Sequence, residues 1–231
     1  MEKEKEKKEK KGKIYMDNDF SITTQNLKID ISENEIFEIQ NLNLIPGKAL
    51  CFLGQIGSGR QKILRTLATM LTPLEGSITS SYERSSFITS SSGVFHNNTV
   101  YDNLYLPMIF SGAQGALVDK LIYDATLRFG LRDILDVYAG KLPLQTQRLI
   151  QYARAFVLQT QVLFIEEPFH GLDKNNYNVI RYALIDLLKT QSSIIIYTTE
   201  HQKDSINLGA QIIRLKQTQN IHKTIVEQDY L

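Results

Sequence analysis

The feature that most constrains the fold is a glycine-rich loop between a short apolar run and a segment of helical periodicity. The run Ala49–Leu53 is continuously apolar, which is typical of a parallel strand buried on both faces. The loop 54–59 follows at once and contains three glycines. Apolar residues then recur at helical spacing, namely Ile63, Leu64, Leu67, Ala68 and Leu71. A strand, a glycine loop and a helix in this order predict a loop whose backbone N–H groups converge on an anion.

The rest of the chain alternates apolar strands with helices. Continuous apolar runs at 162–165 and 194–197 predict two more buried strands, and a closing strand is expected near 212–215. Helical spacing covers 147–158 and 174–189. This alternation predicts an α/β fold with a largely parallel sheet.

Two regions depart from that alternation. Near the N-terminus, residues 27–31 and 37–44 alternate apolar with polar side chains, which is typical of half-exposed strands. Residues 99–140 are predicted to be mostly helical, with a break at 111–115 where glycine and serine gather.

Composition and charge exclude several classes of protein. The 231 residues are enough for one domain with a full core, which we expect over 14–231, after a charged disordered tail over 1–13. The tail carries seven lysines and four glutamates, so the remainder has 19 basic and 21 acidic side chains. That balance argues against binding nucleic acid through phosphate neutralisation. No apolar run approaches the ~18 residues that span a bilayer, and no secretory leader is apparent, so neither a membrane-embedded nor a secreted chain is expected.

Cysteine and histidine point to no disulfide or metal site. The single cysteine, Cys51, lies in the apolar run and is predicted to be a buried thiol. The histidines have no metal-ligand spacing and are expected to be solvated; they are His96, His170, His201 and His222.

The glycine loop matches a phosphate-binding frame in part. The frame G-x-x-x-x-G is usually followed by Lys and then Ser or Thr, whereas this chain has Arg60 and Gln61. Arg60 keeps the positive charge in a planar group, and Gln61 offers an amide in place of the hydroxyl that would bind Mg²⁺. Taken alone, the loop is equally compatible with a turn that holds no ligand. The candidate nucleotide-binding residues are Gly54, Gln55, Gly57, Ser58, Gly59, Arg60, Gln61 and Lys62.

Two adjacent carboxylates follow the strand at 162–165. Glu166 stands where a carboxylate holds Mg²⁺, directly or through water, and with Gln61 it is the predicted metal ligand. Glu167 stands where a carboxylate can orient or deprotonate an attacking water, and it is the predicted catalytic base. Two like charges here suit a cation placed between them and a phosphate, although paired glutamates at a strand end are also common on surfaces.

Together with the glycine loop, the stretch 162–173, VLFIEEPFHGLD, resembles the ATP-binding-cassette (ABC) ATPase family. That family has Asp-Glu-Pro after the strand and then a loop ending in Gly-Leu-Asp. The resemblance extends over about 27–215 and includes 74–78 and 99–107. It implies a P-loop NTPase of ABC type, with a mainly parallel sheet core, an antiparallel β edge and a helical lobe over about 93–150. Residues 92–95 are most similar to the ATPases of Mce-type lipid importers.

Several family motifs are altered. The signature Leu-Ser-Gly-Gly-Gln aligns with 141–145, KLPLQ, where Pro143 removes an N–H and Leu144 adds bulk. The position of the Q-loop glutamine falls at Ser90 or Ser91, and that of the switch histidine falls at Glu200 or, one residue on, at His201.

The family's base and D-loop positions, in contrast, are kept as Glu167 and Asp173. The residue nearest to an adenine-stacking position is Ile31, which is not aromatic.

The resemblance implies an ATP-binding subunit on the cytoplasmic face of a membrane. It would dock a membrane-embedded permease near 95–107 and pair with a second ABC subunit, a copy of itself or a relative, to move a cargo for which a lipid is one candidate. The altered motifs predict retained ATP binding, weak dependence on Mg²⁺ and weak or lost hydrolysis. The alternatives are a structural pseudo-ATPase subunit that binds no nucleotide, and an active ATPase that tolerates the changes.

Overall fold

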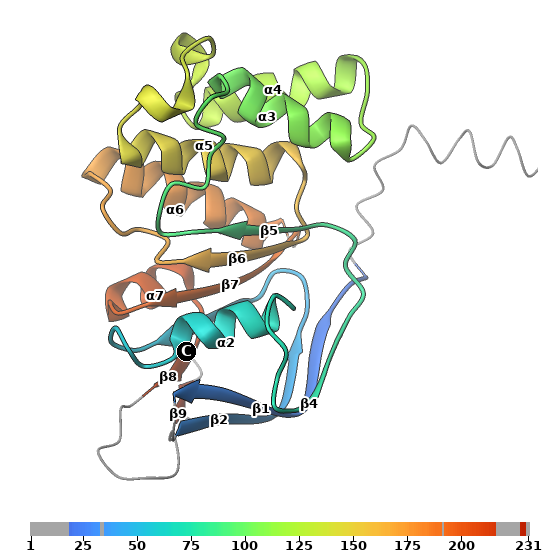
Figure 1. The fold of residues 1–231 in the computed structure, drawn as a ribbon, viewed down its shortest axis with the longest axis vertical. Helices are drawn as coiled ribbons and strands as arrows, with labels where there is room; N and C mark the ends of the chain where they lie inside the picture. Colours follow the sequence, from blue (N-terminus) through green and yellow to red (C-terminus); the bar gives the residue numbers. More distant parts are fainter. Residues whose placement is uncertain (1–18, 33–34, 191, 216–226, 230–231) are drawn as a thin grey trace, which may run out of the picture.

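The computed structural model describes residues 19–32, 35–190, 192–215 and 227–229 (Figure 1). The predicted tail over 1–13 and His222 lie outside these residues. The strands are β1 (Ile22–Ser32), β2 (Glu35–Leu44), β3 (Ala49–Leu53), β4 (Glu75–Ser80), β5 (Ser85–Ile88), β6 (Val162–Glu166), β7 (Ile194–Thr199), β8 (Gln211–Arg214) and β9 (Glu227–Asp229). The helices are α2 (Arg60–Leu67), α3 (Val100–Phe110), α4 (Ala116–Arg128), α5 (Leu144–Val157), α6 (Lys174–Lys189) and α7 (Gln202–Leu208), with 3-10 helices at Arg132–Ile134 and Ala139–Lys141.

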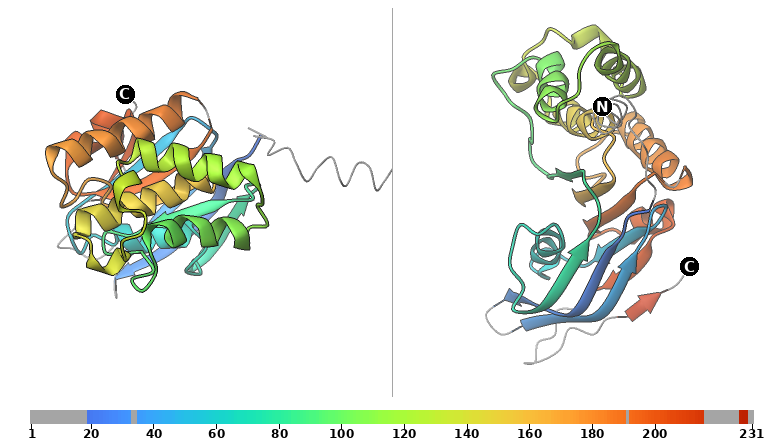
Figure 2. Two further views of the ribbon diagram at one scale, coloured as in Figure 1. Left: turned by 90° about the horizontal axis from the view of Figure 1, so that it is seen from above. Right: turned by 90° about the vertical axis from the view of Figure 1, so that its right-hand side faces the viewer.

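The described strands form two sheets. The larger has the order β5-β6-β7-β3-β8-β9, in which neighbouring strands are parallel except for β9, which pairs antiparallel with β8. The smaller has the antiparallel order β2-β1-β4. Figure 2 shows the helical lobe on one side of the larger sheet and the smaller sheet on the other. The predicted parallel core, antiparallel β edge and helical lobe are therefore confirmed.

The parallel sheet separates two hydrophobic cores. Leu50 and Phe52 of β3 pack with α2 and the smaller sheet, whereas Cys51 between them packs with the helical lobe. The same alternation holds along β6 and β7, because successive side chains of a strand point to opposite faces. Cys51 is fully buried, as predicted, and burial raises the pKa of its thiol to about 12. One short helix, α2, is thus held between two sheets.

The helical lobe differs in part from the sequence expectation. The predicted break at 111–115 is confirmed between α3 and α4, where Gly112 and Gly115 have positive φ of 84° and 74°. Residues 99–140 are mostly helical, as predicted, although the α-helix ends at Arg128 and only short 3-10 helices follow. Gly130 has a φ of 65° just after α4, and the chain then turns back so that Val100 N donates to the carbonyl oxygen of Val137 at 3.0 Å. None of the helices in the described residues combines the length and the apolarity needed to cross a membrane.

Polar side chains of α3 and α5 hold the loop that precedes α3. Asn103 of α3 is fully buried and accepts a hydrogen bond from Phe95 N at 2.8 Å, while its Nδ2 donates to the carbonyl oxygen of Thr99 at 2.8 Å. Arg154 of α5 donates to Asn103 Oδ1 at 2.7 Å and to the carbonyl oxygen of Gly93 at 2.9 Å. Its guanidinium carbon lies 4.9 Å from the ring centre of Phe95. The loop before α3 is therefore fixed to α5.

Candidate functional site

The glycine loop has a conformation that needs glycine. Gly57 and Gly59 have positive φ of 89° and 77°. A Cβ on Gly59 would lie 2.3 Å from the Cβ of Ile31, and one on Gly54 would lie 2.5 Å from Ser58 Oγ. The residue that sequence reasoning placed nearest to an adenine therefore packs directly against the last glycine of the loop. The loop can approach its surroundings this closely only because side chains are missing at these positions.

The loop delivers the start of α2 to the carboxyl end of the parallel sheet. Gly59 is the N-cap of α2 and gives no side-chain cap, and the first turn of the helix contains no acidic residue. The N-terminal N–H groups of such a helix suit an anion. Ser58 Oγ and Arg60 Nε are buried and have no hydrogen-bond partner among the described residues. The loop, the helix end and these two polar atoms together form a cradle with unused donors.

Arg60 is joined to the predicted base. Its Nη2 lies 2.5 Å from Glu167 Oε1, and the two side chains are 5% and 10% exposed. A second N–H of Arg60 donates to the carbonyl oxygen of Gly54, inside the glycine loop. Burial raises the pKa of the Glu167 carboxyl above its ordinary value, an effect that Arg60 opposes and the charge of Glu200 reinforces. The structure thus brings the predicted base to the predicted phosphate loop, 107 residues away in sequence.

The second carboxylate is also held by α2. Arg65 donates from Nε and Nη2 to Glu166 Oε1, at 3.1 and 2.9 Å. The Glu166 side chain is 4% exposed, whereas that of Arg65 is 46% exposed. One helix therefore supplies a guanidinium group to each of the two adjacent glutamates. Sequence reasoning missed Arg65, although its position four residues after Gln61 places both on one helix face.

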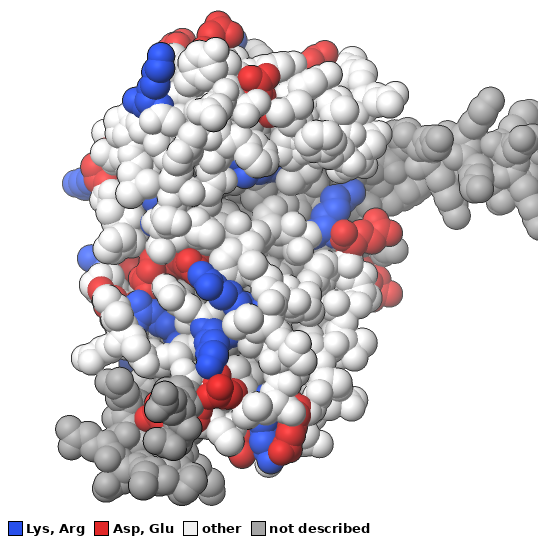
Figure 3. Space-filling model, in the orientation of Figure 1, with Lys and Arg blue, Asp and Glu red and all other residues white. Residues whose placement is uncertain are grey.

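The remaining residues of the predicted site are less enclosed. Lys62 pairs with Asp30 of β1 at 3.2 Å, and both side chains are more than two-fifths exposed. Gln55 and Gln61 are exposed. Among the described residues, no hydrogen bond joins Gln61 to Glu166, and no group of three His, Cys, Asp or Glu residues could hold a metal. Their assignment as metal ligands stays a prediction. Figure 3 shows basic and acidic side chains gathered over the position of α2.

Arg148 of α5 fixes the backbone that carries Glu167. This side chain is almost completely buried, and its N–H groups donate to the carbonyl oxygens of Glu167 at 2.6 Å, Pro168 at 3.3 Å, His170 at 3.1 Å and Ser90 at 3.4 Å. Glu167 itself has a φ of 51°, which is uncommon for a residue other than glycine. The helix after the altered signature therefore positions the predicted base. The arginine of Gln147-Arg148 in the sequence was its only signal.

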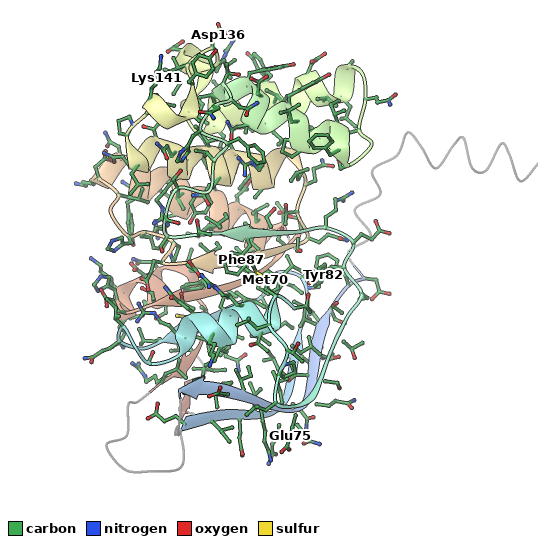
Figure 4. The ribbon with its side chains drawn as sticks, viewed as in Figure 1. Met70, Glu75, Tyr82, Phe87, Asp136 and Lys141 are labelled. Carbon is green, nitrogen blue, oxygen red and sulfur yellow. The ribbon has the colours of Figure 1, made fainter. Side chains whose placement is uncertain are left out.

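The signature and D-loop segments are linked to each other. Gln145 Oε1 accepts hydrogen bonds from Asn176 Nδ2 at 3.0 Å and from Asp173 N at 3.4 Å. Asp173 also caps α6 through Asn176 N at 2.9 Å. Lys141, the first residue of the altered signature, lies on the helical lobe near Asp136 and away from α2 (Figure 4).

The segments that align with the Q-loop and the switch follow β5 and β7, so both lie at the carboxyl end of the parallel strands. The carbonyl oxygen of Ser91 accepts from Gln151 Nε2 at 2.9 Å, so α5 also holds this loop. His201 N donates to Thr199 Oγ1 at 3.1 Å, and the His201 ring lies 3.7 Å from Glu200 Oε1. Both Glu200 and His201 stay predicted candidates for the switch position.

Asp204 is a buried carboxyl behind this segment. It is 3% exposed, and Thr199 Oγ1 donates to its Oδ2 at 3.1 Å. Its Oδ1 has no hydrogen-bond partner among the residues that the structure describes. Burial raises the pKa of this carboxyl above its ordinary value of 3.8. Sequence reasoning missed Asp204 because nothing in its surroundings marks it as buried.

Comparison with known proteins points to one family. A family model described as ABC transporter matches residues 37–170. The sulfate/thiosulfate import ATP-binding protein CysA of Anthoceros angustus is 26% identical over 178 residues, which cover 73% of this chain and 47% of that protein. The cytochrome c biogenesis ATP-binding export protein CcmA of Roseobacter denitrificans is 31% identical over 159 residues, which cover 68% of this chain and 74% of that protein. The chain thus spans about half the length of the first of these relatives.

Solved structures share the fold. A chain from an inward-facing conformation of an ABC transporter matches with a TM-score of 0.76 and 21% identity, covering 92% of this chain and 84% of the other. The structure of cbiO1 from Clostridium perfringens, part of the ABC transporter complex cbiONQ, matches with a TM-score of 0.71 and 19% identity, covering 84% of each chain. The α/β fold of ABC type is therefore confirmed.

The close contact between Gly59 and Ile31 predicts an effect of substitution on stability. Gly59→Ala should lower the free energy of unfolding by about 2–4 kcal/mol, because the new Cβ adds overlap with β1 to the cost of a left-handed residue. Gly112→Ala is the matched control, since its φ is also positive and nothing lies within 4 Å of the added atom; it should cost about 1 kcal/mol. Urea unfolding measures both, and equal losses would show that the Ile31 contact is unimportant.

Asp204 makes a prediction about pH. Because its pKa is raised in the folded state, its contribution to stability is complete below the ordinary value of 3.8 and is lost as the pH rises through the folded-state pKa. Asp204→Asn removes this titration and should gain stability relative to wild type between about pH 4 and about pH 7, by about 1 kcal/mol. Urea unfolding at each pH gives the difference, and a difference that is constant with pH would contradict the assignment.

Proposed function

The chain belongs to the ABC transporter family, and we propose that it is a nucleotide-binding subunit of a membrane transporter in which ATP is bound but its hydrolysis is weak or lost. It works at the cytoplasmic face of a membrane with a membrane-embedded permease and a second ABC subunit, either a copy of itself or a relative. Residues 95–107 are the segment proposed to dock the permease. A lipid is the cargo to test first, and the sole support for it is the similarity of residues 92–95 to the ATPases of Mce-type lipid importers.

The observation that carries the proposal is the contact between Arg60 and Glu167. In the proposed mechanism Arg60 and the backbone N–H groups of the glycine loop hold phosphate oxygens, and Glu167 orients or deprotonates the attacking water. A carboxylate 2.5 Å from a buried guanidinium has its charge compensated and its oxygen engaged, so that oxygen is less accessible to an attacking water. Glu167 therefore lies at the position of the base, but its carboxylate is bound to Arg60.

The glycine cradle supports retained nucleotide binding. Its N–H groups do not depend on the side chains that this chain has changed, and α2 begins there without a side-chain cap. The two buried donors without partners in the described structure, Ser58 Oγ and Arg60 Nε, fit an anion at the same place. A phosphate would have to share Arg60 with Glu167 or displace it.

The second candidate function is a structural subunit that binds no nucleotide. The observation in its favour is that the basic side chains of α2 at 60, 62 and 65 each face a carboxylate. These pairs balance the charge of the loop region without any ligand. The two functions differ in one measurable property, the affinity for ATP.

Binding and hydrolysis of ATP test the proposal. Glu167→Gln removes the anion that holds Arg60, so ATP should bind several-fold more tightly, whereas Arg60→Ala should weaken binding by about tenfold or more. Wild-type phosphate release should be near background and unchanged by Glu167→Gln. Calorimetry and a phosphate-release assay measure these effects, with Asp186→Asn, which breaks the exposed pair with Arg128, as the matched control.

Each other outcome selects a different function. Steady-state hydrolysis that Glu167→Gln abolishes would identify an ordinary ATPase. If the protein is shown to be folded and yet does not bind ATP, the structural subunit is favoured.

The transporter role predicts a membrane partner. Tagged chain extracted from its native membranes in detergent should copurify with a protein that has several membrane spans. Replacing the exposed Phe95 by Glu should reduce this recovery, because Phe95 is 50% exposed within the proposed docking segment. Phe110→Glu, at a still more exposed site (82%) outside the segment, is the control. Recovery of the chain without any membrane protein would contradict the role.

A further inference from the structure

Arg65 lies in the last turn of α2 and reaches the carboxyl end of β6, where it holds Glu166. It lies one helical turn after Gln61. Gln61 itself occupies the position at which a hydroxyl would bind a metal. Two of its N–H groups, on Nε and Nη2, are used on Glu166. A guanidinium has five N–H donors, and this side chain is 46% exposed, so it can engage a second anionic partner while keeping the first.

Glu166 is a poor ligand for a divalent cation in this arrangement. Its Oε1 already accepts two charge-assisted hydrogen bonds from Arg65, and its side chain is 4% exposed. The neighbouring Glu167 carries Arg60. A dication bound to Glu166 would therefore lie beside two guanidinium groups in a place that water does not screen well. The donor set does not fit Mg²⁺ as long as both arginines stay where they are.

We propose that the Arg65 guanidinium is the fixed cation of this site, so that the chain binds ATP without Mg²⁺. The proposal rests on the proposed function and adds how the phosphate charge is compensated. Glu166 fixes Arg65 through two bonds, and the remaining donors of Arg65 would bind oxygens of the polyphosphate. A planar guanidinium matches the spacing of phosphate oxygens, so it supplies both the charge and the orientation.

The arrangement also explains why both glutamates are tolerated without a metal. Adjacent carboxylates repel each other when they are buried, and each here has its own arginine from α2. The cation that the sequence suggested between the carboxylates and a phosphate is supplied by the chain. Glu166 is on this account a positioning residue for Arg65.

Calorimetric titration of the full chain with ATP, in Mg²⁺ and in EDTA, tests the proposal. The wild-type Kd should agree between the two conditions within about threefold. Arg65→Met keeps the aliphatic stem and removes the charge, so the Kd in EDTA should rise by about tenfold, and a dependence on Mg²⁺ should emerge because Glu166 is freed. Arg128→Met is the matched control, because it removes an arginine of similar exposure from a salt bridge on the lobe, and it should change neither Kd.

Glu166→Gln gives a second measurement if Arg65→Met does not fold. It leaves Arg65 charged, so ATP binding in EDTA should be retained. A wild-type affinity that falls by about tenfold or more in EDTA, with that loss abolished by Glu166→Gln, would overturn the proposal and leave the proposed function standing. Absence of ATP binding in both conditions would overturn both. Equal affinity with no effect of Arg65→Met would also overturn it, because another group would then compensate the phosphate charge.

Discussion

The buried ion pair between Arg60 and Glu167 is the interaction on which the rest of the site depends. It joins the first residue of α2 to the loop after β6, two residues that are 107 positions apart in the sequence. A buried pair of this kind is maintained only if both partners are held in place, because losing one costs about 3–5 kcal/mol. The glycine loop fixes Arg60 from one side. Arg148 fixes the backbone of Glu167 from the other side, through the carbonyl oxygens on either side of Pro168.

This arrangement is possible because α2 lies between the two sheets. Ile63, Leu64 and Leu67 are buried in the core that joins the smaller sheet to one face of the parallel sheet. Arg60 and Arg65 of the same helix then reach the carboxyl end of β6, where they bind Glu167 and Glu166. Helix packing and charge pairing therefore support each other, and neither can be moved without the other.

Much of the fold could be predicted from the sequence because buried parallel strands leave a continuous apolar signal. The runs in β3, β6 and β7 were found for this reason. The short polar strand β9 was not, since its pairing with β8 uses backbone groups that leave no pattern. The residues of the site were largely identified by type and order. Their partners were not, because Arg65 and Arg148 look like ordinary helix residues until the fold places them beside Glu166 and the carbonyl oxygens after β6.

The direct bond between Gln145 and the first turn of α6 has a mechanical consequence. The altered signature begins α5, and Asp173 begins α6, so the bond to Asn176 ties the starts of two helices together. In the proposed assembly with a second subunit, the two segments would form one rigid surface. Arg148 lies in α5 with Gln145, so a displacement of the start of α5 would also move Arg148 and the loop that carries Glu167. The helix α5 would thereby couple the signature segment mechanically to the candidate site.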